Sequence, residues 1–295
     1  MTSPKTIQST LLAASAQLKN DDAKLEAQLF LQYALKVNHA WLIAHENDAL
    51  QPNIHAEFEA LLNRRLHGEP MAYILGCREF YGLELMVTPD TLIPRPDTET
   101  LVEAVLGKIP LHENDEIRIL DLGTGTGAIA LAIAKHRPQA SVIAVDASTA
   151  ALEIARKNAE NLNIVNVQFV LSHWFDNLDN ENNNVNQFDV IVSNPPYIEQ
   201  NDAHLTQGDL RFEPLSALVS GVDGLDDIRQ IINNCLIHLK PQGWLMLEHG
   251  YNQAELVTDL MAQTGLTNLE TIRDIAGNNR VTIGKNPLIV STHWD

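Results

Sequence analysis

A short apolar run that leads directly into a glycine-rich turn constrains this chain more than any other feature. Residues 119–128 read Ile-Leu-Asp-Leu-Gly-Thr-Gly-Thr-Gly-Ala, with glycines at three alternate positions. Such glycines let the backbone pass close to a ligand without a Cβ in the way, and a helix that begins after the turn offers free N–H groups. The segment therefore predicts a strand, a turn and a helix that bind a ligand at their junction.

Strand and helix patterns alternate on both sides of this turn. Helical spacing of apolar residues predicts helices at 97–108, 128–135, 150–161, 226–239 and 253–264. Extended apolar runs predict strands at 117–122, 141–146, 167–171, 188–192, 243–248, 269–273 and 280–283. The alternation predicts an α/β fold with a doubly wound, mostly parallel sheet.

The N-terminal part of the chain follows a purely helical pattern. Its apolar side chains fall on three helical stripes: Ile7, Leu11 and Leu18; Leu25, Leu29 and Tyr33; Ile54, Phe58, Leu61 and Leu62. We expect a small all-helical domain that docks the substrate. Residues 79–96 contain extended pieces and three prolines, and so predict a hairpin-like linker. We place the boundary near residue 84, which divides the chain into 1–84 and 85–295.

The charge balance limits the class of partner. The 295 residues include 38 acidic and 20 basic side chains, a formal net charge of −18. Residues 1–84 hold seven basic and ten acidic side chains, and residues 85–295 hold 13 and 28. A protein that grips nucleic acid through its phosphates needs clustered Lys and Arg, which neither part has. We therefore expect no direct contact with nucleic acid and a surface that favours basic partners.

Cysteine and histidine spacing gives no support for a disulfide framework or a metal site. Cys77 and Cys235 lie 158 positions apart, and we expect both to be buried reduced thiols. The tetrapeptide His-Glu-Asn-Asp occurs at 45–48 and again at 112–115. Both copies lack the HExxH spacing of a zinc site, so we attribute the repeat to coincidence.

Two segments bear on solvation and location. Residues 177–187 are rich in Asn, Asp and Glu and predict a solvated surface loop. Residues 1–10 lack the apolar core of a signal peptide, and no later run approaches the ~18 apolar residues of a membrane span. We expect a cytoplasmic protein without a membrane partner.

An acidic residue at the end of the next strand narrows the choice of ligand. Asp146 ends the strand predicted at 141–146, where a carboxylate can accept both hydroxyls of a ribose. The turn has the spacing G-x-G-x-G, whereas G-x-G-x-x-G seats a pyrophosphate. An adenosyl ligand without a pyrophosphate therefore fits better than NAD, and S-adenosylmethionine is the candidate. Trp174, beyond the strand at 167–171, is a candidate wall for the adenine.

A second motif follows the strand predicted at 188–192. Residues 193–197 read Ser-Asn-Pro-Pro-Tyr, and the two prolines end the sheet pairing and fix the backbone. Asn194 supplies a side-chain acceptor, Pro195 a carbonyl and Tyr197 a flat aromatic face. Together they can hold a planar NH2 group through its two N–H donors. The motif therefore predicts a binding site for an amine or amide.

The two motifs together resemble class I S-adenosylmethionine-dependent methyltransferases that modify exocyclic amines of bases or the side-chain amide of glutamine. Along nearly its whole length the chain is similar to one branch, the release factor glutamine methyltransferase family. Residues 78–82 (Arg-Glu-Phe-Tyr-Gly) and 93–99 (Ile-Pro-Arg-Pro-Asp-Thr-Glu) also carry this resemblance. It implies a Rossmann-like sheet and an enzyme that methylates N5 of the glutamine in the Gly-Gly-Gln motif of peptide-chain release factors.

The resemblance also implies a cofactor site. Asp146 would bind the ribose of S-adenosylmethionine, and Trp174 would lie along the cofactor. The turn would contact the methionine part of the cofactor through Gly123, Thr124, Gly125, Thr126 and Gly127.

The same resemblance implies a site for the glutamine. Asn194, Pro195 and Tyr197 would be the catalytic residues, Pro196 would complete the substrate site, Asn194 would also touch the cofactor, and no metal is expected. The family usually has Gly-Asn-Asp-Arg late in the chain, but residues 277–280 here read Gly-Asn-Asn-Arg. The chain therefore departs from the family pattern at Asn279, where it lacks that carboxylate.

Three other functions stay open. Adenine and guanine N-methyltransferases of nucleic acid can carry the same Asn-Pro-Pro-Tyr, although the net charge of −3 in residues 1–84 argues against such a substrate. Methylation of a ribosomal protein on glutamine is compatible with the charge. A non-catalytic adenosyl-binding protein would not need both halves of the site, and detectable methyl transfer would exclude it.

Overall fold

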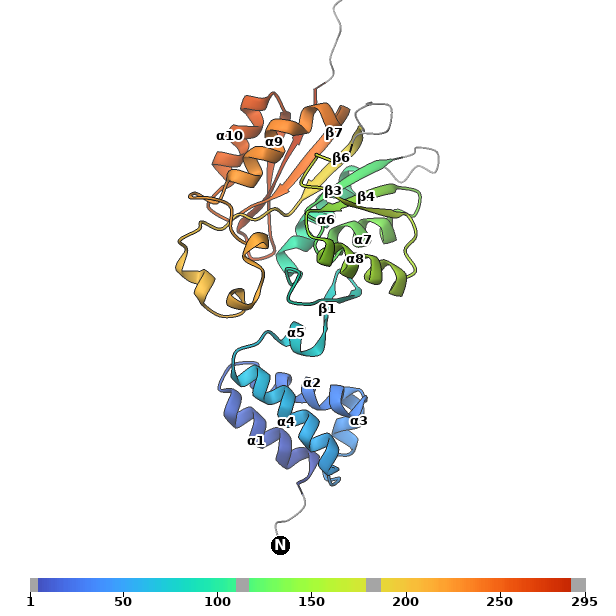
Figure 1. Cartoon of the computed structure of the whole chain (residues 1–295), viewed down its shortest axis with the longest axis vertical. Helices are drawn as coiled ribbons and strands as arrows, with labels where there is room; N and C mark the ends of the chain where they lie inside the picture. The colour runs from blue at the N-terminus through green and yellow to red at the C-terminus, as the bar shows by residue number, and fades with distance from the viewer. Residues whose placement is uncertain (1–4, 110–116, 179–186, 288–295) are drawn as a thin grey trace, which may run out of the picture. The chain divides into compact units, whose positions relative to one another are not determined.

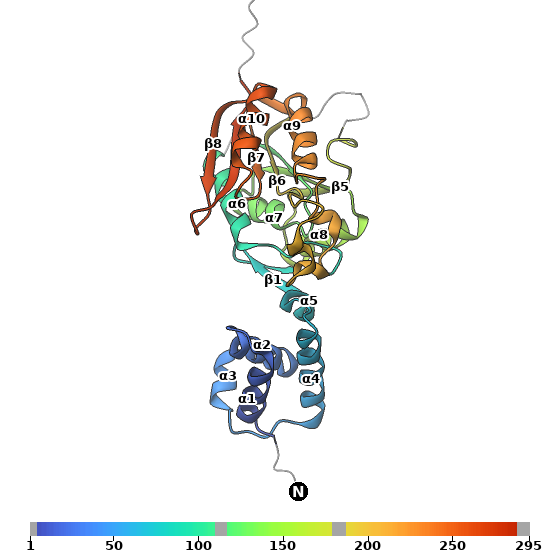
Figure 2. The ribbon, with the colours of Figure 1, turned by 90° about the vertical axis from the view of Figure 1, so that its left-hand side faces the viewer.

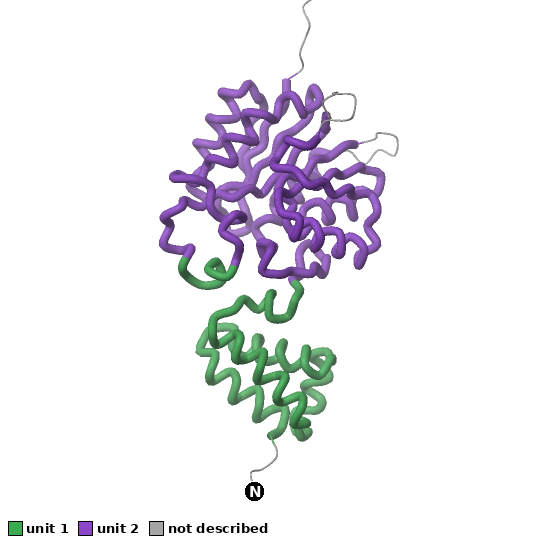
Figure 3. The backbone as a smooth tube through the Cα atoms, in the orientation of Figure 1, with its two compact units in different colours: residues 1–77, 206–212 green, residues 78–205, 213–295 purple. Residues whose placement is uncertain are grey.

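The computed structural model describes residues 5–109, 117–178 and 187–287 (Figure 1). Of the sequence predictions, the second His-Glu-Asn-Asp copy at 112–115 and most of the 177–187 loop lie outside these ranges. The chain forms two compact units (Figure 3). One comprises Met1–Cys77 together with Thr206–Phe212, and the other comprises Arg78–Leu205 together with Glu213–Asp295. These units are defined by contacts between residues. The prediction of two domains, 1–84 and 85–295, concerns independent folding and stays a prediction.

The described residues of the first unit form five α-helices around one apolar core. They are α1 (Ile7–Leu18), α2 (Ala23–Leu35), α3 (His39–Ala44), α4 (Pro52–Leu66) and α5 (Met71–Leu75). Thr6 caps α1 in a capping box, and Asn38 caps α3. The predicted stripe on α2 is wrong, because Leu25 and Tyr33 are exposed. The adjacent face is buried instead, since it carries the larger Phe30 beside alanines that let α1 and α4 approach closely.

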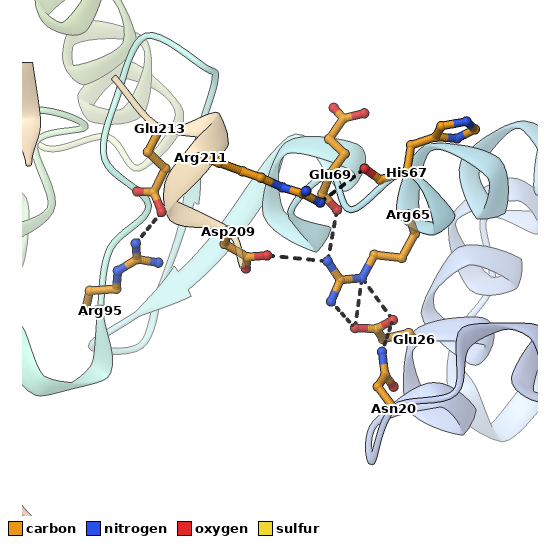
Figure 4. Close-up of polar contacts among 9 residues, drawn as sticks. All are labelled: Asn20, Glu26, Arg65, His67, Glu69, Arg95, Asp209, Arg211 and Glu213. Atoms are coloured by element: carbon orange, nitrogen blue, oxygen red, sulfur yellow. Dashed lines mark hydrogen bonds and ion pairs between the residues drawn. The ribbon is translucent and has the colours of Figure 1, made fainter. Parts of the chain in front are cut away.

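Residues 206–212 belong to the helical unit although they lie far along the chain (Figures 3 and 4). Asp209 pairs with Arg65 at 3.4 Å, and the guanidinium of Arg65 is also held by Glu26 at 2.8 Å. Directly after this segment, Glu213 returns to the second unit. There its carboxylate pairs with Arg95 and accepts the backbone N–H of Ile93 at 3.1 Å. The chain therefore connects the two units three times.

The second unit begins with a hairpin, as the sequence predicts. Strands β1 (Cys77–Phe80) and β2 (Leu83–Met86) form a two-stranded sheet. Tyr81 and Gly82 have positive φ angles of 49° and 76°, as a two-residue turn that matches the twist of the strands requires. A 3-10 turn, η1 (Pro96–Thr98), then leads into α6 (Glu99–Lys108).

A seven-stranded sheet with helices on both faces forms the rest of this unit (Figures 1 and 2). Its strands are β3 (Arg118–Leu122), β4 (Ser141–Asp146), β5 (Val167–Leu171), β6 (Phe188–Ser193), β7 (Leu239–Glu248), β8 (Thr267–Arg273) and β9 (Asn279–Lys285). Its other helices are α7 (Ala128–His136), α8 (Thr149–Asn161), α9 (Asp226–His238) and α10 (Ala254–Thr264). The strand order is β5-β4-β3-β6-β7-β9-β8; β9 pairs antiparallel with both β7 and β8, and the other described pairs are parallel. The predicted doubly wound, mostly parallel sheet is confirmed.

Alternation along the central strands gives the sheet its two cores. In β3, Ile119 packs with α6 and α7, whereas Leu120 packs with α9 and α10. In β6, Val190 packs in the same core as Ile119, and Ile191 packs in the same core as Leu120. Because successive side chains of a strand point to opposite faces, one strand supplies both layers.

The order of the strands creates the crevice that matters for function. From β3 the chain moves outward through β4 and β5 on one side, and then returns to place β6 and β7 on the other side. In open α/β sheets ligands bind at the carboxyl ends of the strands, at the point where the order reverses. Here that point lies between Leu122, which ends β3, and Ser193, which ends β6.

The expected burial of the two cysteines can be judged in the described residues. In the described residues no disulfide joins the two cysteines, and Cys235 is buried whereas Cys77 is half-buried, so the expectation that Cys77 is buried is wrong. No group of metal-binding side chains occurs in the ranges that the structure covers. In the same ranges, no helix is both long and apolar enough to cross a membrane.

Candidate active site

A cavity of about 530 Å³ opens at the carboxyl ends of β3, β4 and β6. Six of the residues that the sequence singled out line it: Gly123, Gly125, Asp146, Trp174, Asn194 and Pro196. The remaining lining residues come from the 89–92 linker, from the start of α8, from residues 172–173, from the 214–217 segment and from Asp227. The structure therefore brings both motifs together in one cavity, as expected for adjoining strands.

The three glycines of the turn all have positive φ angles, but the space around each of them differs. A Cβ on Gly123 would lie 3.3 Å from the Trp174 ring, and a Cβ on Gly127 would lie 3.0 Å from Leu131. A Cβ on Gly125 would meet nothing within 4 Å. Gly123 and Gly127 thus permit close packing, and Gly125 leaves open space beside the cavity.

Asp146 is held rigidly at the rim of this space. Its Oδ2 accepts the N–H of Gly125 at 2.8 Å, and its Oδ1 accepts the N–H of Ser148 at 2.8 Å. Burial raises the pKa of this carboxyl, while the backbone N–H groups oppose that rise. Each oxygen keeps a second lone pair, so the carboxylate can still accept hydroxyl groups from a ligand.

Asp121 is a structural residue of the site that sequence reasoning missed. It is fully buried, and its Oδ2 accepts the Thr124 hydroxyl at 2.6 Å and the Ala130 N–H at 3.2 Å. Burial raises its pKa to about 7. The carboxyl ties β3, the turn and α7 together. The signal was present in the sequence, since this acidic residue interrupts an otherwise apolar strand.

The hydroxyl residues of the turn face inward. Thr124 is engaged by Asp121, and the carbonyl of Thr126 accepts the Asn158 side chain at 2.9 Å. Neither threonine lines the cavity, and neither does Gly127. These three residues shape the turn that Gly123 and Gly125 present to the cavity.

Trp174 packs over the turn. It is 9% exposed, has a φ angle of 49°, and its carbonyl accepts the Ser172 hydroxyl at 3.0 Å. Its indole Nε1 has no hydrogen-bond partner among the described residues. Because this nitrogen is itself buried, Trp174 lines the cavity with another part of the residue.

The Asn-Pro-Pro-Tyr motif divides its side chains between the cavity and the interior. Asn194 donates through Nδ2 to the Thr98 hydroxyl at 3.1 Å, and its Oδ1 accepts no hydrogen bond from the residues that the structure describes. Pro196 lines the cavity, whereas Pro195 is buried and does not line it. The Tyr197 hydroxyl points to Glu248, at 3.3 Å from Oε1, and this tyrosine does not line the cavity either.

Behind the motif lies a buried polar cluster that the sequence did not reveal. Burial raises the pKa of Glu248 to about 7, and burial together with the nearby Glu248 charge raises the pKa of Tyr197. Arg280 pairs with Asp97 at 3.0 Å and with Asp274 at 3.1 Å. Asp274 therefore provides a carboxylate to this arginine in a chain that has Asn rather than Asp at position 279.

Comparison with known proteins finds a matching protein family for each part of the chain. Residues 9–76 match the family described as PrmC N-terminal domain, and residues 113–283 match the family described as Methyltransferase domain. The release factor glutamine methyltransferase of Xylella fastidiosa (strain Temecula1) is 47% identical over 90% of this chain and 94% of its own. That of Vibrio cholerae is also 47% identical, over 95% of this chain and 96% of its own. The chain belongs to the release factor glutamine methyltransferase family.

Membership in the release factor glutamine methyltransferase family confirms the resemblance read from the two motifs. A methyltransferase from Pyrococcus furiosus, 19% identical with a TM-score of 0.52 over 77% of this chain and 98% of its own, shares the fold. The match to a methyltransferase domain confirms S-adenosylmethionine as the methyl donor. The cavity suits that donor, because it offers a glycine turn and a held carboxylate, and Trp174 lines it.

Proposed function

We propose that this enzyme transfers the methyl group of S-adenosylmethionine to N5 of the glutamine in the Gly-Gly-Gln motif of peptide-chain release factors. The observation that carries the proposal is the side chain of Asn194, which lines the cavity with its NH2 group engaged by Thr98. Its Oδ1 is thereby left to accept an N–H donor. The names of the relatives support the choice of substrate.

The cofactor site uses the residues around the glycine turn. Asp146 would bind the ribose hydroxyls, and the Gly123 and Gly125 backbone would adjoin the methionine part. Trp174 would lie along the cofactor, while Thr124, Thr126 and Gly127 would hold the turn in shape. When bound, S-adenosylmethionine supplies an electrophilic methyl group on a sulfonium.

The substrate site must make the weakly nucleophilic amide nitrogen of glutamine react with the methyl group. An amide nitrogen is a poor nucleophile because its lone pair is delocalised into the carbonyl. Asn194 Oδ1, which lines the cavity, would accept one N–H bond of the glutamine. Although Pro195 itself does not line the cavity, the backbone carbonyl of this adjacent residue would accept the other N–H bond, so that the nitrogen is directed at the methyl carbon. Pro196 lines the cavity beside them, and Tyr197 supports the motif from the interior. Attack requires approach to roughly 3–3.5 Å, so the contribution is one of positioning. The glutamine nitrogen would bond to the methyl group in place of one of its two protons, and that proton would leave to solvent.

The same two acceptors explain selectivity for glutamine. A glutamate side chain has no N–H to donate, and its charge would face two acceptor oxygens. Sites that hydrogen-bond a particular group reject analogues that lack it, because the site's own polar atoms are then left unpaired. The enzyme should therefore discriminate strongly against a Gly-Gly-Glu motif.

The remaining assignments concern the partner. We assign docking of the release factor to the helical unit, and the acidic surface to the attraction of a factor that binds the ribosome and is locally basic. A cytoplasmic location without membrane or direct nucleic-acid contact follows from that partner.

Intact-mass analysis tests the proposed function. Purified release factor is incubated with the enzyme and S-adenosylmethionine, beside a matched factor whose motif is Gly-Gly-Glu. We expect one added methyl group on the first factor and none on the second. A methyl group on the Gly-Gly-Glu factor would contradict the assigned atom. Methylation of ribosomal protein or nucleic acid but of neither factor would contradict the assigned substrate.

A further inference from the structure

Two stretches of the second unit that lie far apart in the sequence both line the cavity. Residues 89–92 come from the linker before η1, and residues 214, 216 and 217 come from the long connection between β6 and α9. Neither stretch belongs to the sheet, so strand pairing does not hold it in place. Other contacts therefore fix where the two stretches lie, and with them the shape of the cavity.

One buried carboxylate joins the two stretches. Glu213 directly precedes the second stretch, and its side chain has no exposed surface. Its Oε2 accepts the backbone N–H of Ile93 at 3.1 Å, and its Oε1 accepts the guanidinium of Arg95 (Figure 4). Both partners follow directly after the first stretch. Each oxygen of Glu213 thus binds a different residue of the linker, although Glu213 itself does not line the cavity.

The linker presents these two donors on a restricted backbone. Residues 93–96 read Ile-Pro-Arg-Pro, and each proline fixes its own φ angle and favours an extended conformation in the residue before it. Arg95 accordingly has a φ angle of −99° and a ψ angle of 142°. This run opens the 93–99 motif, and no residue of that motif, all of which the structure describes, lines the cavity. The motif therefore acts on the cavity through the residues that it contacts.

The far end of the second stretch is held separately. Ile198, which follows the Asn-Pro-Pro-Tyr motif, pairs in parallel with Val219. Its N–H donates to the Leu218 carbonyl at 2.8 Å, and its own carbonyl accepts the N–H of Ser220 at 2.9 Å. Glu213 therefore holds the near end of residues 214–217, and the pairing with Ile198 holds the far end.

We propose that Glu213 is a positioning residue for the methyl donor. Together with Arg95 it holds residues 214–217 against the linker, and so sets the width of the cavity that binds S-adenosylmethionine. The charge is essential to this role, because a carboxylate accepts hydrogen bonds through both of its oxygens. The inference rests on the proposed function, which places the cofactor in this cavity. It divides the work between two residues, since Asn194 positions the glutamine whereas Glu213 shapes the cofactor site.

The first test removes the charge of Glu213 and keeps its shape. In Glu213→Gln one oxygen becomes an NH2 group, which cannot accept from either Ile93 or Arg95. We expect the Kd for S-adenosylmethionine, measured by calorimetry, to rise about tenfold. At saturating cofactor, kcat for the release factor should stay within about threefold, because Asn194 is held by β6 and Thr98 instead. An unchanged Kd, or equal losses in affinity and in kcat, would overturn the inference.

Asp189 provides a matched control, because its carboxylate also joins a backbone N–H to a cation. Its Oδ2 accepts the N–H of Arg118 at 2.8 Å and the Nζ of Lys240 at 2.7 Å. It lies near the start of β6 and does not line the cavity. Asp189→Asn should lower the free energy of unfolding in urea, yet leave the Kd for S-adenosylmethionine within about twofold. A similar rise in Kd in both variants would assign the effect to a general loss of stability and overturn the inference.

The second test asks whether Glu213 and Arg95 act as a pair. Arg95→Met removes the guanidinium and leaves the buried carboxylate without its cation. It should also raise the Kd for S-adenosylmethionine about tenfold, whereas Arg95→Lys, which keeps the charge, should bind within about threefold of the parent chain. The double variant Glu213→Gln, Arg95→Met should bind no more weakly than the weaker single variant. Effects on Kd that multiply in the double variant would show independent contributions and overturn the pairing.

The outcomes separate this inference from the proposed function. Cofactor affinity is measured without a release factor, so a failure to methylate the factor contradicts the proposed substrate and not the role of Glu213. If the enzyme methylates the factor, but Glu213→Gln and Arg95→Met bind S-adenosylmethionine as the parent chain does, the function stands and the positioning role is overturned. Thermal unfolding of each variant, measured in parallel, identifies a substitution that unfolds the chain, and the other single variant then decides.

Discussion

Asp121 shows how one buried carboxyl can shape a binding turn while it lowers stability at neutral pH. Its pKa is raised from 3.8 to about 7 because burial disfavours the charged form. In the unfolded chain the same group loses its proton near pH 4. The unfolded state therefore binds fewer protons between about pH 4 and 7, and the contribution of Asp121 to stability falls as the pH rises through that range.

Asp121→Asn should remove this pH dependence. The amide can still accept the Thr124 and Ala130 donors through its oxygen, but it cannot ionise. We expect the free energy of unfolding of the variant, relative to the parent chain, to rise between pH 4 and 7 by on the order of 3 kcal/mol. Urea denaturation at several pH values measures this difference. A constant difference across the range would show that Asp121 ionises normally.

Gly123 provides a second test at the residue scale. Its φ angle is 71°, and an added Cβ would lie 3.3 Å from the Trp174 ring. Gly123→Ala should therefore weaken binding of S-adenosylmethionine at least tenfold, as measured by calorimetry. The matched control is Gly107→Ala in α6, where a Cβ meets nothing within 4 Å, and helix propensity predicts a small gain in stability. Equal affinity in the two variants would contradict the role of the turn.

Individual residues were predictable from the sequence where a motif concentrates them. Gly123, Asp146 and Asn194 were identified in this way and line one cavity. Thr98 and Glu248 were missed because each is an ordinary residue in its own segment and becomes part of the site only through long-range packing. Tyr197 was expected as an aromatic face for the substrate, but its hydroxyl instead joins the buried cluster.

Asn158 determines how three elements meet. Its Oδ1 accepts the N–H of Met86 at 2.7 Å, and its Nδ2 donates to the carbonyls of Met86 and Thr126 at 3.0 and 2.9 Å. One side chain of α8 thus holds the end of β2 and the glycine turn. Each of these backbone groups would otherwise be left without a partner in the interior.

Asn158→Ala should destabilise the second unit by about 2–4 kcal/mol, because it leaves buried backbone groups unsatisfied. The matched control is Asn161→Ala, at the exposed end of the same helix, which should change stability by less than about 0.5 kcal/mol. Equilibrium urea unfolding measures both variants. If the two variants had similar free energies of unfolding, the Asn158 contacts would make no net contribution to stability.

At the scale of elements, each strand and helix that apolar periodicity predicted in the second unit is present in the structure. The predictions for β4 and β5 match the observed bounds, whereas β7 begins at Leu239 rather than at residue 243. That difference arises because Lys240, Pro241 and Gln242 interrupt the apolar run. The 3-10 turns η2 (Ala203–Thr206), η3 (Leu210–Phe212) and η4 (Leu215–Ala217) were not predicted. Such short turns depend on tertiary contacts, such as the pairing of Asp209 with Arg65.

At the scale of the whole molecule, the net charge of −18 has a kinetic consequence. If the acidic surface attracts a locally basic release factor, salt should screen that attraction. We expect the association rate constant, measured by stopped-flow fluorescence, to fall severalfold between 50 mM and 300 mM NaCl, with a smaller change in the dissociation rate. An association rate that is insensitive to salt would contradict electrostatic capture.

Family membership and fold class were both predictable for the whole chain, because the motifs lie in order on a regular α/β framework. The assignment of residues 206–212 to the helical unit was not predictable, since it rests on contacts between segments more than a hundred residues apart. No local pattern marks such a segment.

The measurement that tests the central claim most directly is a comparison of turnover and cofactor affinity in Asn194→Ala. If Asn194 acts by positioning the glutamine amide, kcat should fall at least a hundredfold, while the Kd for S-adenosylmethionine changes less than about threefold. Single-turnover methylation of the release factor and calorimetry on the same preparation give the two values. Equal losses in turnover and in cofactor affinity would contradict the account.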